Sequence, residues 1–276
     1  MPVVAEPLSR HIGAEISGVS LADLSSEVAD ELRDLLHKYH VLFLRDQPIT
    51  PHQLAEAARQ FGPLEVHAFA RHLEDPPEVG ILDQTEPNKD GANNWHTDST
   101  FQPEPPFGSM LQAVQLPTVG GDTTWASMIA AFDALSPMMQ ETLDGLTAMH
   151  DVRGPLLRAV AGGHAVQGID EVIAEWPPRE HPVVCRHPET GQRFLYVNSN
   201  FTTRINEVTE AESDALLLFL FQHVRTPEFQ VRFRWNEGSV ALWDNRCTQH
   251  YASADYDERR IMHRVTIAGT WAPSAN

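Results

Sequence analysis

Three residues that could bind one metal ion constrain this chain more than any other feature of its sequence. His96 and Asp98 are two positions apart in the segment WHTDSTF. Side chains at positions i and i+2 of an extended segment point from the same face, so this imidazole and this carboxylate can converge on one ion. His250 is the natural third ligand, because it follows a short apolar run, residues 240–243, and a polar turn. Two imidazoles and one carboxylate form a facial triad, which leaves coordination positions open and suits non-haem Fe(II).

The last predicted strand adds two cationic side chains. Residues 260–267 read RIMHRVTI, so Arg260, Met262, Arg264 and Thr266 share one face of a strand. Two guanidinium groups on one face of a largely apolar strand require anions nearby. They could be surface arginines that pair with carboxylates of the chain, or they could bind anions beside the metal.

The composition limits the class of protein and its partners. The chain has 276 residues, 42% of them hydrophobic, and no linker or repeat divides it, so we expect one domain over residues 1–276. A formal net charge of −18 argues against nucleic-acid and anionic-membrane surfaces, because phosphate binding requires a cationic face. No apolar run could span a bilayer and the N-terminus does not resemble a signal peptide, so we expect a cytoplasmic protein. Cys185 and Cys247 are too few for a disulfide framework.

The predicted elements favour a mainly β fold with peripheral helices. Strands are expected near residues 12–19, 41–44, 110–116, 183–185, 194–197, 229–235, 239–243 and 260–268. Helices are expected after the capping residues Ser25 or Ser26, Thr50 and Thr209, and over residues 127–135 and 137–143. Many strands, few helices and a metal site drawn from both halves of the chain indicate a jelly roll with the site in its mouth.

Two segments are predicted to lack regular structure. Residues 83–94 are polar and should form a loop that leads to His96. Residues 151–180 contain Gly154-Pro155, Gly162-Gly163 and Trp176-Pro177-Pro178, and we expect them to be irregular. Such a segment is either a lid or binding loop over the site, or a solvated insertion.

Five motifs of the chain, taken together, resemble the taurine dioxygenase family of Fe(II)- and 2-oxoglutarate-dependent oxygenases. They are HIGAEISGV, WHTDSTF, GGDT, WDNRCTQHYA and RRIMHR, and the resemblance extends from about residue 10 to residue 270. It implies a double-stranded β-helix, a cupin-like variant of the jelly roll. It also implies that His96, Asp98 and His250 bind the iron.

The resemblance implies roles for other side chains. Arg260 and Thr123 would bind the distal carboxylate of 2-oxoglutarate, since a guanidinium can hold a carboxylate through two hydrogen bonds and a hydroxyl adds a donor. Arg264 would bind the anionic head of the substrate. His67 would help to hold a sulfonate, and Phe201 would form an aromatic wall of the pocket.

Three positions depart from the family pattern. Ala70 replaces a tyrosine, Leu156 replaces an aromatic residue, and Ala92 replaces a pocket asparagine, for which the adjacent Asn93 is the candidate substitute. These changes would enlarge the substrate pocket and remove polar contacts from it.

The implied reaction consumes 2-oxoglutarate and O2, yields succinate and CO2, and hydroxylates the carbon next to a sulfonate, which releases sulfite and an aldehyde. Alkyl sulfate esters, larger sulfonates and aryloxyalkanoates remain alternative substrates. The family also suggests a homodimer or a larger homo-oligomer.

Two other classes of protein would use some of the same residues. A zinc hydrolase could use three N and O ligands with a bound water, but it would leave Arg260 and Thr123 without a role. A non-catalytic binding protein with this fold would be expected to have lost a metal ligand, and all three candidates are present.

Overall fold

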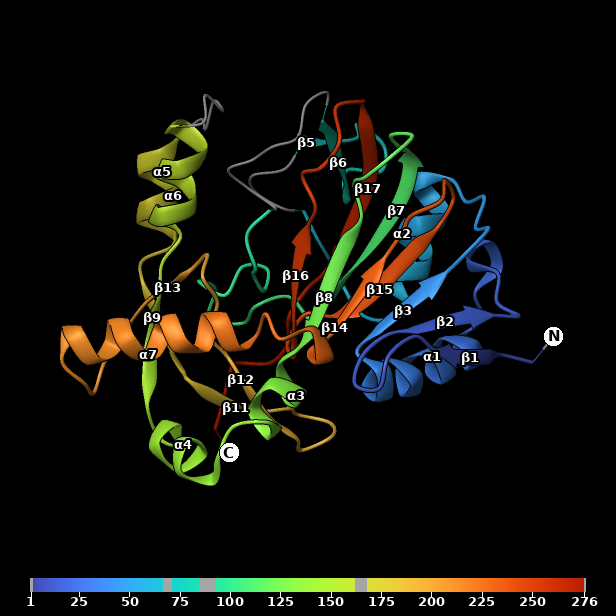
Figure 1. Cartoon of the computed structure of the whole chain (residues 1–276). Helices are drawn as coiled ribbons and strands as arrows, with labels where there is room; N and C mark the ends of the chain where they lie inside the picture. The colour runs from blue at the N-terminus through green and yellow to red at the C-terminus, as the bar shows by residue number, and fades with distance from the viewer. Residues whose placement is uncertain (1, 67–70, 85–92, 162–167, 276) are drawn as a thin grey trace.

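The computed structural model describes residues 2–66, 71–84, 93–161 and 168–275 (Figure 1). The strands are β1 (Val4–Pro7), β2 (Ala14–Ser17), β3 (Val41–Leu44), β4 (Leu64–Glu65), β5 (Arg71–His72), β6 (Val79–Gln84), β7 (Gly108–Gln115), β8 (Thr123–Ser127), β9 (Thr147–His150), β10 (Arg179–Pro182), β11 (Val184–Arg186), β12 (Arg193–Leu195), β13 (Thr202–Ile205), β14 (Gln230–Phe233), β15 (Val240–Asp244), β16 (Thr248–Ala252) and β17 (Arg260–Ile267). The α-helices are α1 (Ser26–Tyr39), α2 (Pro51–Arg59), α3 (Met128–Asp133), α4 (Pro137–Leu143), α5 (Arg153–Ala161), α6 (Ile169–Glu175) and α7 (Glu210–His223), and the short 3-10 helices are η1 (Leu21–Asp23) and η2 (Pro227–Phe229).

A large sheet and a small sheet form the centre of the fold. The large sheet has the strand order β1-β2-β3-β15-β7-β17-β6-β5, with β4 beside β17, and the small sheet has the order β14-β8-β16. Strands that are distant in the chain are therefore neighbours, as in a jelly roll. This arrangement is the predicted mainly β fold with peripheral helices.

An apolar core fills the space between these two sheets. Phe43 on β3 stacks on Phe233 on β14, with ring centroids 4.1 Å apart. Trp125 on β8 contacts both Phe43 and Trp243 on β15. All four side chains are buried. Because these rings bury large areas, they fix the spacing of the two sheets and of the side chains that the sheets carry.

Helices α1 and α2 cover the outer face of the large sheet. Ser25 caps α1, and a capping box of Thr50 and Gln53 opens α2, both as predicted. Leu36 on α1 and Leu54 on α2 are fully buried in a cluster that includes residues of β3, β15 and β17. This packing holds the back of the sheet whose inner face carries Arg260 and Arg264.

The prediction of an irregular segment at residues 151–180 is wrong. It contains α5 and α6, which form a separate helical projection in Figure 1, and it ends at the start of β10. Gly154 and Pro155 lie in the first turn of α5, where a proline costs no helical hydrogen bond. Gly168 begins α6 with a left-handed φ of 67°. Gly154, Pro155 and Gly168 thus lie at the starts of helices, whereas Pro177 and Pro178 follow the end of α6. Residues 162–167 lie outside the described part.

Two strands near the site are not predicted from the sequence. β6 occupies the approach to the expected loop at 83–94, of which residues 85–92 are outside the described ranges. β16 contains His250, where the sequence indicates a polar turn. Both strands are ordered by pairing with distant strands, β6 with β17 and β16 with β8, and this pairing is not visible in the local sequence.

The structure also bears on the cysteines and on helices that could span a membrane. Cys185 and Cys247 are buried free thiols. Within the described ranges, no helix combines the length and apolarity needed to cross a bilayer.

Candidate functional site

The two segments that carry the triad are bonded to each other through their backbones. The His96 N–H donates to the His250 carbonyl at 3.1 Å, and the His250 N–H donates to the His96 carbonyl at 2.8 Å. Next to this pair, the Thr97 hydroxyl donates to the Thr248 carbonyl at 2.7 Å. A short antiparallel bridge thus places the two imidazoles side by side, with ring centroids 4.2 Å apart.

The predicted triad is assembled at this bridge. The Nε2 atom of His96 lies 3.6 Å from Oδ1 of Asp98, and Nε2 of His250 lies 4.0 Å from Oδ2. One ligand atom from each residue lies within 4.8 Å of the other two, and all three residues are buried. Such a set could hold one ion.

The hydrogen bond of His96 and the burial of His250 fit a metal site. Nδ1 of His96 lies 2.6 Å from the Asn94 carbonyl, which can only accept, so Nδ1 is the donor and Nε2 is the ring atom that faces Asp98. Burial lowers the pKa of His250 to about 3, helped by the charges of His96 and Arg264 and opposed by Asp98. His250 is therefore neutral at pH 7, which is the state that binds metal ions.

A second buried group of possible ligands consists of His187, Asp244 and Cys247. Asp244 is fully buried and already makes two hydrogen bonds to Arg246, at 2.9 and 2.6 Å, and one to Nε2 of His187 at 3.0 Å. Burial opposes ionisation of Asp244, but Arg246 and His187 outweigh it and keep the pKa of the carboxyl below its usual value. Because its carboxylate is already neutralised by Arg246, this group is a structural network.

Arg260 lies on β17 with its guanidinium in the interior. It is 4% exposed, its Nε donates to the Gly121 carbonyl at 3.2 Å, and its Nη2 has no hydrogen-bond partner among the described residues. Burial lowers the pKa of this guanidinium. A buried cation with an unused donor is suited to binding the carboxylate of a ligand.

Glycine is required where the chain passes Arg260. Gly121 has a φ of +73°, and a Cβ at this position would lie 3.2 Å from Cδ and Nε of Arg260. A side chain here would strain the backbone and displace the guanidinium. The second glycine of the GGDT motif therefore maintains the position of the arginine.

Thr123 lies near the same part of the site. The register of β8 with β16 pairs Thr123 with Ala252 and Trp125 with His250, so Thr123 and His250 are on the same face of the small sheet. The Thr123 hydroxyl is buried and accepts a hydrogen bond from the Trp235 indole at 3.0 Å. Its own proton is therefore available to a ligand.

Arg264 lies next to the triad. Its Nη1 atom is 3.5 Å from Oδ1 of Asp98, and its side chain is 14% exposed. Arg260 and Arg264 share one face of β17 and are about 13 Å apart along the strand. One strand thus presents two separate cationic groups to the interior, as the alternation in the sequence predicts.

Phe201 belongs to an apolar cluster beside the triad. Its ring contacts that of Phe101, with centroids 5.2 Å apart, and Phe101 contacts Trp176 at 5.8 Å. Leu156 on α5 is buried in the same cluster, and residues of α6 pack against it. Since Phe101 is three residues after Asp98, the cluster connects the helical projection to the metal segment. The contributions of Phe101 and Trp176 were not predicted.

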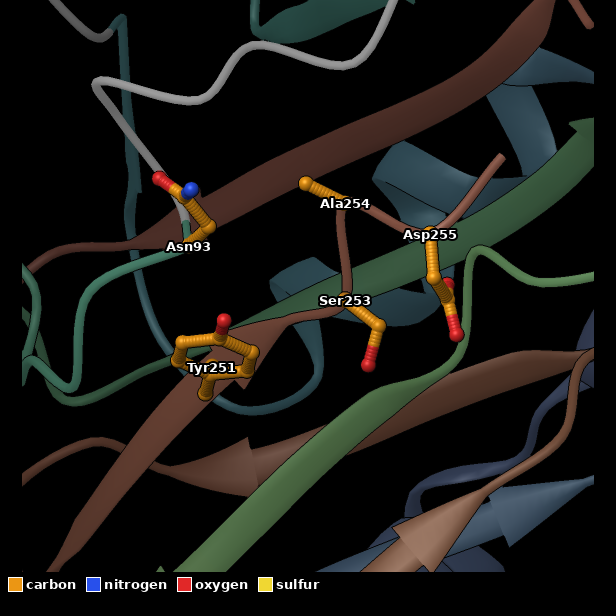
Figure 2. Close-up of a pocket in the computed structure, with 5 residues that line it drawn as sticks. All are labelled: Asn93, Tyr251, Ser253, Ala254 and Asp255. Atoms are coloured by element: carbon orange, nitrogen blue, oxygen red, sulfur yellow. The ribbon is translucent and has the colours of Figure 1, made fainter. Parts of the chain in front are cut away.

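Asn93 lies beside the end of β16. It lines a cavity of about 410 Å³ with Tyr251, Ser253, Ala254 and Asp255, and Figure 2 shows Asn93 and Tyr251 at one end of it. Tyr251 follows His250 in β16, so the two side chains point to opposite faces of the small sheet. The cavity that Asn93 lines is therefore bordered by Tyr251, on the face of the small sheet opposite the His250 side chain.

Three other positions of interest, His67, Ala70 and Ala92, lie outside the described residues.

Comparisons with known proteins identify the family. The family model described as taurine catabolism dioxygenase TauD, TfdA family, matches residues 5–266, and the chain belongs to this family. A protein from Pseudomonas putida named alpha-ketoglutarate-dependent sulfate ester dioxygenase is 36% identical, over 95% of this chain and 88% of its own length.

Solved structures give the same result. A taurine dioxygenase from Burkholderia xenovorans is 36% identical with a TM-score of 0.84, over 98% of this chain and 90% of its own. The structure of AAD-2 in complex with Mn(II) and N-oxalylglycine is 29% identical with a TM-score of 0.85, over 99% of both chains. The protein is therefore a jelly-roll dioxygenase that depends on Fe(II) and 2-oxoglutarate, also called alpha-ketoglutarate, and these predictions are confirmed.

Proposed function

We propose that this dioxygenase hydroxylates the carbon next to the sulfonate group of a small organic anion, and so releases sulfite and an aldehyde. The observation that carries this proposal is the position of Arg264 next to Asp98. A guanidinium beside the triad can hold an anionic head group, so that the adjacent carbon is placed at the metal.

We assign the iron to His96, Asp98 and His250, and the distal carboxylate of 2-oxoglutarate to Arg260 and Thr123. When bound, the iron supplies the oxidative chemistry in which O2 and 2-oxoglutarate are consumed, succinate and CO2 are formed, and a hydroxyl is added to the substrate. The residues bind and orient the reactants and exclude water. The unused donor of Arg260 and the free proton of Thr123 support this assignment.

The product needs no further catalysis from the protein. A carbon that carries both a hydroxyl and a sulfonate can lose sulfite as its hydroxyl proton leaves, and the carbon becomes an aldehyde. For taurine the products would be sulfite and aminoacetaldehyde. No additional acid or base is therefore required of the chain.

The same site would accept related anions. A sulfate ester, a larger sulfonate or an aryloxyalkanoate would present a charged group to Arg264, and hydroxylation beside the ester or ether oxygen would release sulfate or a phenol. The relative named as a sulfate ester dioxygenase supports the first of these alternatives. His67 and Asn93 remain candidate substrate residues.

We propose that the whole chain acts as one catalytic domain in which α5 and α6 form a lid. The cluster that joins Leu156 and Trp176 to Phe101 and Phe201 supports this role, since it gives the substrate an apolar wall. We also propose a homo-oligomer, as the family resemblance suggests, and a cytoplasmic location.

A substrate panel tests the proposal. The Fe(II)-loaded protein would be given 2-oxoglutarate, O2 and, separately, taurine, hexanesulfonate, hexyl sulfate and a phenoxyacetate, while succinate is measured with sulfite, sulfate or phenol. Succinate matched by sulfite from a sulfonate would support the main proposal. Succinate matched only by sulfate or phenol would move the assignment to that substrate class, and metal-dependent turnover without 2-oxoglutarate would overturn it.

A further inference from the structure

The backbone of Asp98 is held by one buried side-chain amide. The Asp98 N–H donates to Oδ1 of Asn245 at 2.9 Å, and Nδ2 of Asn245 donates to the Asp98 carbonyl at 3.1 Å. Nδ2 also donates to the Pro106 carbonyl at 3.2 Å, and Asn245 is fully buried. Both backbone groups of one predicted metal ligand are thus bonded to a single residue far away in the sequence.

Asn245 gives Asp98 two backbone hydrogen bonds of the kind that a neighbouring strand would give. The bridge between His96 and His250 ends before Asp98, because the chain turns at Ser99, which has a left-handed φ of 51°. Asp98 lies beyond this bridge, where its backbone N–H and carbonyl are bonded to Asn245. A primary amide offers a donor and an acceptor in one plane, as a peptide group does, so Asn245 can supply both bonds.

Asn245 is itself held firmly. Its N–H donates to the Phe107 carbonyl at 2.9 Å. On either side of it, Asp244 and Arg246 form the buried ion pair described above, and the Thr248 hydroxyl donates to the Asp244 carbonyl at 2.7 Å. The backbone that carries the Asn245 amide therefore has little conformational freedom. A residue that orients another residue requires such a fixed position.

We propose that Asn245 is a positioning residue that directs the Asp98 carboxylate toward the metal. This inference rests on the proposed role of Asp98 as a metal ligand. Arg264 is close enough to compete for the same carboxylate, at 3.5 Å from Oδ1. With its backbone fixed by Asn245, Asp98 has only its side-chain torsions to adjust, and metal binding does not have to order the segment.

The direct test is the affinity of the metal-free protein for Mn(II), measured by titration, together with its melting temperature. Asn245→Leu removes both bonds, and Asn245→Asp keeps the acceptor but removes the donor. We expect both variants to weaken Mn(II) binding, by about tenfold or more for Asn245→Leu, which is typical for residues that orient metal ligands. Asn245→Asp should lie between wild type and Asn245→Leu.

A matched control separates positioning from general stability. Gln112 on β7 is another buried amide, and its Nε2 donates to the Ile49 carbonyl at 2.9 Å, away from the triad. Gln112→Leu should lower the melting temperature while the dissociation constant for Mn(II) stays at the wild-type value. If Asn245→Leu and Asn245→Asp bind Mn(II) as wild type does, or lose affinity only as much as Gln112→Leu does, the proposal is wrong.

Asp98→Ala distinguishes this proposal from the proposed function. If Asp98→Ala loses Mn(II) binding and the two Asn245 variants do not, only the positioning role fails. If Asp98→Ala also binds Mn(II) normally, the triad assignment fails and the positioning role fails with it.

Discussion

The guanidinium of Arg264 and the carboxylate of Asp98 lie 3.5 Å apart, which joins the predicted anion site directly to the predicted metal site. A substrate anion bound by Arg264, as proposed, would share this cation with Asp98, the proposed metal ligand. Substrate binding and the electrostatics of the metal are therefore coupled through one side chain.

Arg264→Ala should chiefly weaken the binding of the organic substrate. Loss of a charge-assisted contact of roughly 1.5–3 kcal/mol predicts an increase of about 10- to 150-fold in the KM for that substrate. Arg264→Lys should be intermediate, because it keeps the charge but loses the planar pair of donors. Steady-state succinate formation at varied substrate concentration would check this prediction.

Arg260→Ala should instead raise the KM for 2-oxoglutarate by a similar factor. Arg260 has an unused buried donor for that cosubstrate. It lies on the same face of β17 as Arg264, four residues away along the strand. The same assay, with 2-oxoglutarate varied, measures the effect. If the two alanine variants affect both KM values equally, the two arginines do not divide the work as proposed.

The lid proposal predicts a specific effect at Trp176. Trp176→Ala removes the ring that contacts Phe101, so water should reach the site more easily and more 2-oxoglutarate should be consumed without substrate product. Leu157→Ala is a suitable control, because Leu157 is on α5 but 59% exposed. The ratio of succinate to hydroxylated product should rise in the first variant and stay at the wild-type value in the second. An unchanged ratio in Trp176→Ala would argue against a lid.

Buried histidines predict a loss of stability in acid. Burial lowers the pKa values of His40 and His181 to about 4, while hydrogen bonds to the carbonyls of Gln102 and Thr100 partly oppose the shift at His181. The folded protein therefore holds both residues neutral, whereas the unfolded chain protonates them below about pH 6.5. The stability they contribute is complete above pH 6.5 and is lost as the pH falls toward 4, by roughly 1–2 kcal/mol each at pH 5.

Urea unfolding of the metal-free protein at pH 7.5 and pH 5 would check this effect. His181→Gln cannot be protonated, so the difference in unfolding free energy between the two pH values should be smaller in the variant than in wild type. An equal difference would show that His181 does not contribute. Because wild type and His181→Gln are compared over the same two pH values, the effect of pH on the large negative charge of the chain cancels.

Local signals predicted much of the fold. The caps at Ser25, Thr50 and Thr209 depend on contacts within one helical turn, and each is formed as expected. The alternation on β17 also depends only on neighbouring residues. Such features are readable because their causes lie within a few positions of the chain.

Other features depend on contacts that the sequence does not display. β16 is a strand because β8 pairs with it. α5 contains a glycine and a proline in its first turn, and a glycine is the N-cap of α6, so their positions relative to the helix starts had to be known. The role inferred for Asn245 is of the same kind, because nothing local indicates that its amide meets Asp98. The triad could be predicted from the types and spacing of its residues. The contact through which Asn245 holds Asp98 could not.

The most direct test of the account is substrate-dependent succinate formation by the wild-type protein and by Asp98→Ala, each supplied with Fe(II), 2-oxoglutarate, O2 and the best member of the substrate panel. The account predicts one succinate for each substrate hydroxylated by wild type, no succinate when Fe(II) or 2-oxoglutarate is omitted, and none from Asp98→Ala even though it is folded. Turnover by wild type without 2-oxoglutarate, or wild-type turnover by Asp98→Ala, would contradict it.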